Sequence, residues 1–354
     1  MPKKIFFDAR FIKTTGSDGI SRYSHELLCE FAKLTDVTAI IYTDEQHELL
    51  PTSVKTVLLN NPQSLSEIFI ARKLNKLGAD IVFSPMQIMG SLGKQYKLIL
   101  SLHDTIYYQF KTAPNNISKY MQFFWKLFHI SKLPQRLTLN RADAVVTVSK
   151  SSKLEIEKMK LTKKPIVVIP NAANDVFSSK INVQADNKLL YMGSFFSYKN
   201  VEFLVKAMNQ LPDYELHLLS KVTSAVKRKL RESMGLQSTV VFHDGTSEKE
   251  YMDLLMTSFA MVSASKAEGF GLSLIEAMKS GLPVVCSDLA IFHEVTNDEA
   301  LFFDTHSIDD FQHKIRMLED KKTRNNLIAS GVLAADKYSW AKSAKKLLRY
   351  IDTM

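Results

Sequence analysis

The sequence is poor in cysteine, in long apolar runs and in metal-ligand patterns, and each lack excludes a class of protein. Its two cysteines, Cys29 and Cys286, stand far apart in apolar segments, which argues against a disulfide framework and favours a reducing compartment. No apolar run reaches the ~18 residues of a membrane span, and residues 1–7 lead straight into a predicted strand, unlike a signal peptide. No Asp-x-Asp, His-x-His or cysteine pair has ligand spacing, so we expect a cytoplasmic, soluble or peripheral protein without metal or cofactor.

The size and charge of the chain set broad limits. A length of 354 residues predicts two domains of roughly 170 residues each. The net charge of +9 suits phosphate-bearing substrates, anionic membrane surfaces or nucleic acid, and by itself it does not choose among them.

A glycine-rich turn is the most informative stretch. It joins a predicted buried strand, residues 259–263, to a predicted helix, residues 273–280, after which a second strand follows. Two carboxylates eight positions apart, Glu268 and Glu276, lie in the turn and in the first turn of the helix. The exposed backbone N–H groups of residues 270–273 would face an anion held at the helix start.

The segment Glu-Gly-Phe-Gly-Leu-Ser-Leu-Ile-Glu-Ala-Met-x-x-Gly-x-Pro-Val-Val resembles the Glu-x7-Glu signature of family-4 retaining glycosyltransferases. The resemblance implies that Glu268 contacts hydroxyls of the donor sugar and that Glu276 holds the ribose of the sugar nucleotide. The backbone between them would bind the diphosphate and the sugar through Phe270, Gly271, Leu272 and Ser273. Ser273 replaces the family's usual Pro, and Ser273 with Glu276 also matches a capping box, which would make the pair structural.

Gly19 stands between a predicted first strand, residues 4–9, and a predicted helix, residues 20–33. The segment Gly-Ile-Ser-Arg-Tyr resembles a loop of the same family, in which the glycine lets the backbone approach the donor phosphates. The alternative is a plain turn glycine. The surrounding loop is not Gly-x-Gly-x-x-Gly, which argues against a dinucleotide site.

His103 follows a predicted strand, residues 97–102. Ligands of open α/β sheets bind beyond the carboxyl ends of the strands, so a His-Asp pair is well placed there. The resemblance implies that His103 reaches the donor sugar. The alternative is a histidine packed under a loop, with Asp104 as a cap.

Lys199 precedes Asn200, the predicted N-cap of a helix over residues 201–209, where an anion would be favoured. The resemblance implies that Lys199 neutralises the donor diphosphate; the alternative is a solvated turn lysine. Many family members also carry an Arg in this loop, at positions where this sequence has Ser194, Ser197 and Tyr198.

Residues 107–136 combine aromatic and basic side chains, and residues 111–139 contain no Asp or Glu. The centre of the stretch, residues 117–128, has helical spacing. Such a helix can lie on an anionic membrane surface. Alternatively, its apolar face packs in a core and its basic face is solvated.

The resemblance extends over almost the whole chain. It implies an α/β GT-B fold, with two Rossmann-like domains that face each other across a cleft: residues 1–175 bind the acceptor and residues 186–335 bind the sugar nucleotide. A helix within residues 336–354 returns to the first domain. The implied reaction is retaining, metal-independent transfer of a sugar to a hydroxyl of a glycan or lipid-linked acceptor, in bacterial surface polysaccharide synthesis, with no nucleic-acid partner.

Three other functions are the alternatives to this interpretation. A sugar-nucleotide 2-epimerase of the same fold would convert its donor without an acceptor. A nicotinamide-dependent oxidoreductase is disfavoured by the absent glycine fingerprint. A non-catalytic basic protein would bind a membrane or nucleic acid through its surface, with the Glu pair as a structural cap.

Overall fold

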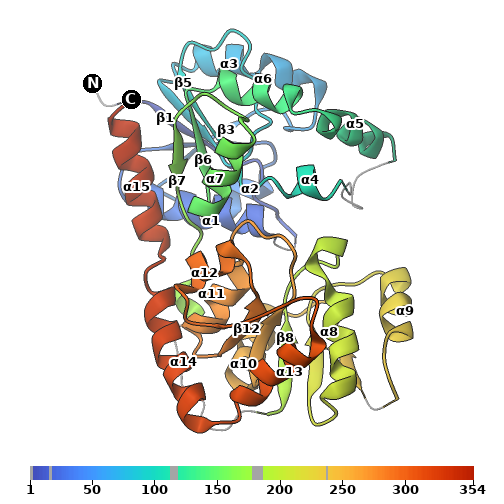
Figure 1. The fold of residues 1–354 in the computed structure, drawn as a ribbon. Helices are drawn as coiled ribbons and strands as arrows, with labels where there is room; N and C mark the ends of the chain where they lie inside the picture. Colours follow the sequence, from blue (N-terminus) through green and yellow to red (C-terminus); the bar gives the residue numbers. More distant parts are fainter. Residues whose placement is uncertain (1–2, 16–17, 112–118, 178–185, 237) are drawn as a thin grey trace. The chain divides into compact units, whose positions relative to one another are not determined.

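The computed structural model describes residues 3–15, 18–111, 119–177, 186–236 and 238–354 (Figure 1). Two compact units result: the first holds residues 1–171 and 339–354, and the second holds residues 172–338. Each unit is built around one parallel sheet with helices in its connections. This confirms the predicted α/β class with two Rossmann-like domains.

The sheet of the first unit has the strand order β3-β2-β1-β4-β5-β6-β7. Its strands are β1 (Ile5–Asp8), β2 (Thr38–Ile41), β3 (Lys55–Leu58), β4 (Ile81–Ser84), β5 (Lys97–Ser101), β6 (Ala144–Thr147) and β7 (Ile166–Val168). Neighbouring strands are parallel. Strands β1, β4 and β6 are buried along their whole length, as expected of a parallel sheet that is covered on both faces.

The connections of the first unit carry α1 (Gly19–Ala32), α2 (Glu45–Glu48), α3 (Ile70–Lys76), α4 (Ile106–Gln109), α5 (Lys119–Ile130), α6 (Leu133–Arg141) and α7 (Lys150–Lys158). The last helix, α15 (Trp340–Asp352), packs against α1. The ring of Trp340 meets that of Tyr23 edge-on, at 5.9 Å between centroids. The chain therefore ends in the unit where it began.

The sheet of the second unit has the strand order β10-β9-β8-β11-β12-β13. Its strands are β8 (Lys188–Tyr191), β9 (Glu215–Leu218), β10 (Thr239–Phe242), β11 (Ala260–Ser263), β12 (Val284–Ser287) and β13 (Leu301–Phe303). Its helices are α8 (Val201–Ala207), α9 (Ser224–Glu232), α10 (Glu248–Thr257), α11 (Leu272–Lys279), α12 (Ala290–Thr296), α13 (Ile308–Met317) and α14 (Lys321–Ala335). Apolar side chains of strands and helices, among them Leu204, Leu216 and Phe311, form its core.

Each sheet has one point where the strand order reverses. In the first unit the chain leaves β1 towards β2 and β3 and then returns to place β4 on the other side of β1; in the second unit β8 and β11 stand in the same relation. The loops after two such strands diverge to opposite sides and leave room for a ligand beyond the carboxyl ends. The loops after β8 and β11 carry Lys199 and Glu268.

Some elements differ from those predicted. A helix expected over residues 64–77 starts as a 3₁₀ turn, Leu65–Phe69, before α3. The pattern predicted neither α6 nor α12. Helix α6 begins without a side-chain cap, so it lacks the polar residue that marks a helix start in sequence. Residues 178–185, between the two predicted domains, lie outside the described residues.

Candidate functional site

Lys199 and Glu268 form an ion pair beyond the carboxyl ends of β8 and β11. Lys199 ends a 3₁₀ turn, Ser197–Lys199, and its Nζ donates to a carboxylate oxygen of Glu268. The two side chains are 15% and 18% exposed. An ion pair that is partly removed from water, yet reachable, suits an incoming ligand that exchanges one charged partner for another.

The two loops that carry this pair are tied together through their backbones. The N–H of Lys266 donates to the carbonyl of Tyr198 at 2.7 Å. Within the first loop, the hydroxyl of Tyr191 donates to the carbonyl of Ser194 at 2.5 Å. Gly193 is required beside it, since a Cβ there would lie 2.9 Å from the Tyr191 hydroxyl. Burial raises the pKa of Tyr191, which keeps the hydroxyl protonated as a donor.

Helix α11 begins directly after Gly271, which has φ 90° and ψ 49°. This left-handed conformation favours glycine, and a Cβ would in addition lie 3.0 Å from the ring of Phe292. Since glycine has no side chain, it does not cap the first N–H groups of the helix. The N–H of Leu274 donates to the carbonyl of Gly271 at 3.0 Å, which leaves those of Leu272 and Ser273 to face an anion.

The capping-box interpretation of Ser273 and Glu276 is wrong. Ser273 is the second residue inside α11 rather than its N-cap. The carboxylate of Glu276, which is 2% exposed, instead accepts a hydrogen bond from the hydroxyl of Tyr251 at 3.0 Å. The side chain of Phe270 is also buried and meets the ring of Tyr338 edge-on, so only its backbone is left to face a ligand.

Asn200 is the N-cap residue of α8, as predicted, but it does not cap the helix with its side chain. It adopts a left-handed conformation with φ 53°, and its side chain makes no capping hydrogen bond. Lys199 thus stands before a helix whose first N–H groups are not capped by that side chain.

Sequence reasoning missed the contact that anchors the other end of α11. Lys279 is 7% exposed, and its Nζ donates to a carboxylate oxygen of Asp175 at 2.7 Å and to the carbonyl of Ala173 at 3.3 Å. The pairing ties α11 to the segment with which the second unit begins. No local pattern signals it, because 104 residues separate the partners.

In the first unit, Gly19 and His103 are linked through α1. Gly19 is the first residue of α1, and a Cβ there would meet nothing within 4 Å, so a ligand can approach its backbone. Four residues later, Tyr23 meets the His103 ring edge-on, at 4.9 Å between centroids. Asp18 caps the helix by accepting from the N–H of Ser21 at 2.8 Å.

The surroundings of His103 fix its tautomer. Its Nε2 lies 2.8 Å from the carbonyl oxygen of Pro85, and because a carbonyl only accepts, Nε2 carries the proton. Burial lowers the pKa of His103, so the ring is neutral at pH 7 and Nδ1 is an acceptor. His103 is thus packed against Tyr23, as the structural alternative predicted. Its Nδ1 nevertheless keeps a lone pair that can accept a hydrogen bond.

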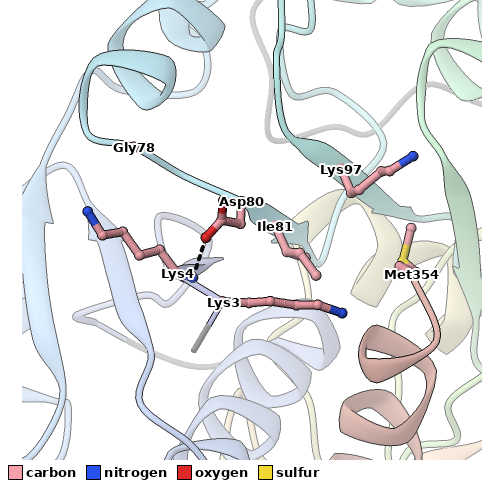
Figure 2. Close-up of a pocket in the computed structure, with 7 residues that line it drawn as sticks. All are labelled: Lys3, Lys4, Gly78, Asp80, Ile81, Lys97 and Met354. Atoms are coloured by element: carbon pink, nitrogen blue, oxygen red, sulfur yellow. Dashed lines mark hydrogen bonds between the residues drawn. The ribbon is translucent and has the colours of Figure 1, made fainter. Parts of the chain in front are cut away.

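The hollow drawn in Figure 2 lies at the amino ends of strands in the first unit's sheet, opposite their carboxyl ends. It measures about 540 Å³, and Lys3, Lys4, Asp80 and Lys97 line it at the amino ends of β1, β4 and β5. Lys3 already donates to the carbonyl of Ile351 at 2.9 Å. Since ligands of open parallel sheets bind at the carboxyl ends, we assign this hollow no part in the site.

The described ranges of the chain also bear on metal binding and on membrane insertion. In those ranges no three His, Cys, Asp or Glu side chains are grouped so as to hold a metal ion. None of the helices described there combines the length and the apolarity that crossing a bilayer requires.

Comparisons with known proteins agree with this layout. Residues 17–176 match the family model described as Glycosyltransferase Family 4, and residues 174–332 match the one described as Glycosyl transferases group 1. The O-antigen chain mannosyltransferase RfbU of Salmonella typhimurium is 27% identical over 317 residues, which cover 85% of this chain and 87% of that protein. The serotype-specific mannosyltransferase WbdA of Escherichia coli is 28% identical over 240 residues, or 61% of this chain, but the match spans only 29% of that longer protein.

Among solved structures, Anabaena Alr3699/HepE in complex with UDP-glucose superimposes with a TM-score of 0.74 at 16% identity. The match covers 99% of this chain and 100% of that one. This likeness extends the α/β architecture to the GT-B fold. Since the two family models together span residues 17–332, the chain belongs to the family-4 glycosyltransferases.

Proposed function

We propose that the protein is a retaining glycosyltransferase of bacterial surface polysaccharide synthesis. It transfers a sugar from a nucleoside-diphosphate sugar to a hydroxyl of a glycan or lipid-linked acceptor. One observation carries the proposal: the Lys199–Glu268 pair stands beyond the carboxyl ends of β8 and β11, close in sequence to the α11 start that no side chain caps. The names of the two mannosyltransferase relatives support the setting and make GDP-mannose the first donor to test.

Each predicted donor contact of the second unit has a role in this proposal. The Lys199 ammonium and the N–H groups of Gly271, Leu272 and Ser273 bind the diphosphate. Glu268 is released from Lys199 and accepts hydrogen bonds from hydroxyls of the sugar. Glu276 accepts from the ribose hydroxyls and is oriented by Tyr251, while Phe270 contributes backbone only.

We carry Gly19 and His103 of the first unit into the proposal as donor contacts. The open space beside Gly19 allows a phosphate to approach its backbone. The neutral His103, with Nε2–H held by the Pro85 carbonyl, presents Nδ1 as an acceptor for a sugar hydroxyl.

The reaction follows from these contacts. The bond between the anomeric carbon and the diphosphate oxygen breaks, and its electron pair stays on the β-phosphate. The acceptor oxygen bonds to the anomeric carbon on the same face, and its proton passes to the departing phosphate. Lys199 and the helix amides stabilise the charge that develops there. The proposal needs no metal, because these groups supply the positive charge.

Thermal shift with UDP, GDP, dTDP and ADP tests donor binding, with EDTA present. A ligand at 100 times its dissociation constant stabilises its protein by about 2.7 kcal/mol. We expect one nucleoside diphosphate to shift the wild type and not Lys199→Ala. Lys206→Ala is the matched control. Lys206 also pairs with a carboxylate, that of Glu202 at 2.9 Å, but both partners lie within α8 and neither is a predicted donor contact.

Transfer itself is then measured with sugar nucleotides that carry the base identified by thermal shift, starting with GDP-mannose and UDP-glucose. The readout is release of the nucleoside diphosphate with and without acceptor glycans. Acceptor-dependent release supports the transferase. Conversion of the donor without any acceptor would replace it by the epimerase.

A further inference from the structure

Helix α5 exposes an apolar stripe. Its residues Tyr120, Phe123, Leu127 and Ile130 are all between 46% and 71% exposed, and their spacing of three and four residues places them on one helical face. Leu133 and Leu137, at the start and in the middle of α6, are also more than half exposed. In Figure 1, α5 lies beyond α6 and away from the sheet of its own unit.

The opposite face of α5 is the one that holds the helix to the protein. The Trp125 ring stacks on that of His129 at 4.1 Å, and it meets the ring of Tyr107, from α4, edge-on at 5.1 Å. His129 also lies 5.4 Å from the ring of Tyr108. The inward face is therefore aromatic and packed, while the outward face is apolar and wet. The alternative in which the apolar face of the helix packs in a core is wrong for these four exposed side chains, whereas Lys126 of α5 is solvated, as that alternative expected.

The charge around the stripe has one sign. Residues 105–142 contain six Lys or Arg and no Asp or Glu. Arg136 is engaged, since its guanidinium donates to the carbonyls of Lys160 and Met159. Lys126, Lys132 and Arg141 are exposed. An apolar stripe with cations beside it is complementary to a membrane of anionic lipids, whose acyl chains lie below negatively charged head groups.

We propose that α5 and the start of α6 dock on an anionic membrane surface, with the stripe in the interface and the cations against the lipid phosphates. A second copy of this chain is disfavoured as the occupant, because two such surfaces would bring like charges together. The docking is independent of which donor or acceptor the enzyme uses. Residues 112–118 of the predicted 107–136 surface lie outside the described residues and carry none of the argument.

Co-sedimentation with vesicles of phosphatidylcholine, with and without phosphatidylglycerol, tests the proposal. We expect the wild type to bind only the vesicles with phosphatidylglycerol, and less at high salt. The double variant Leu127→Ser/Ile130→Ser should lose about tenfold or more in partition. The double variant Lys126→Gln/Lys132→Gln should lose about thirtyfold at low salt, at roughly 1 kcal/mol per cation.

Matched controls come from α7 of the same unit. Leu154→Ser removes a leucine that is 65% exposed, and Lys158→Gln removes an exposed lysine; both should bind vesicles like the wild type. Thermal melting and the nucleotide shift of every variant check that both units are folded. Wild-type protein that ignores phosphatidylglycerol, or a stripe variant that binds undiminished, overturns the proposal. So does a wild-type dimer that the stripe variant dissociates, since the stripe would then serve self-association.

Discussion

Both units of the chain shield paired charged groups from water, but the first unit also exposes a stripe of large apolar side chains. In the second unit Lys199 and Glu268 form an ion pair that is largely shielded from water, and the buried Lys279 pairs with the exposed Asp175. The first unit likewise buries an ion cluster, in which Arg10 pairs with Asp8 and Glu67, but it also leaves an apolar stripe exposed along α5. Under the two proposals, the small charged donor is bound by groups that internal partners hold in place, whereas the membrane surface is bound by apolar side chains that are otherwise exposed to water.

The largest effect is expected from Glu268→Gln, which should break the function of the second unit without touching the first. Losing one preorganised contact to the reacting sugar costs about 10²- to 10³-fold in turnover. Diphosphate release in the transfer assay measures it, and vesicle binding should be unchanged. Glu202→Gln, which removes the carboxylate that pairs with Lys206, is the control. Normal turnover in Glu268→Gln would mean that the ion pair is only structural.

Gly271→Ala should destabilise the second unit by about 1–3 kcal/mol, because alanine is strained at φ 90° and its Cβ meets Phe292. Gly93→Ala is the matched control in the first unit. Gly93 also has positive φ, 76°, but a Cβ there meets nothing within 4 Å, so only the strain, about 1 kcal/mol, remains. Urea unfolding measures both. Equal losses would show that the contact with Phe292 contributes nothing.

Tyr251→Phe should raise the KM for the sugar nucleotide about three- to tenfold and change kcat little, since it removes one hydrogen bond that orients Glu276. Tyr214→Phe removes the same kind of bond elsewhere in the unit, a hydroxyl that donates to Glu319 at 2.9 Å. Steady-state kinetics with varied donor distinguish the two. A KM increase in both variants would point to general loosening of the unit rather than to Glu276.

The smallest effect concerns pH. Glu215, His217, His243 and Glu250 form a chain of three contacts of 3.0–3.1 Å. Burial lowers the pKa of His217 below its unfolded value. The stability that this group contributes is therefore present above about pH 6.5 and lost as the pH falls, by at most about 1.4 kcal/mol per pH unit.

Urea unfolding at pH 7.5, 6.5 and 5.5 checks this expectation. His217→Gln should flatten the pH dependence of the unfolding free energy, and His306→Gln, at a histidine that is 87% exposed, should not. A slope that stays the same in His217→Gln would assign the acid sensitivity to other groups.

The turn, the α11 helix and its C-terminal end at Gly281 were predictable, because glycines, Pro283 and the apolar run are local signals. The start of α11 was misplaced, since Ser273 looks like a cap while the actual entry is a left-handed Gly271. The partner of Glu276 was not predictable. Its contact with Tyr251 depends on how α10 and α11 pack, and so does the Lys279–Asp175 pair, which joins distant segments.

The same limit applies to the first unit. The basic, aromatic composition of residues 107–136 was evident in the sequence, but the division of α5 into a packed face and an exposed face was not. That division depends on tertiary packing, in which Trp125 meets Tyr107 and His129 meets Tyr108, both on α4.

The most direct test of the account is calorimetric titration with the sugar nucleotide and with its bare nucleoside diphosphate, in EDTA, on the wild type, Lys199→Ala and Glu268→Gln. If Lys199 binds the diphosphate and Glu268 binds the sugar, Lys199→Ala weakens both ligands by about 10- to 100-fold. Glu268→Gln then weakens only the sugar nucleotide. Equal affinities of all three proteins for both ligands would contradict the assignment of the donor site to this ion pair.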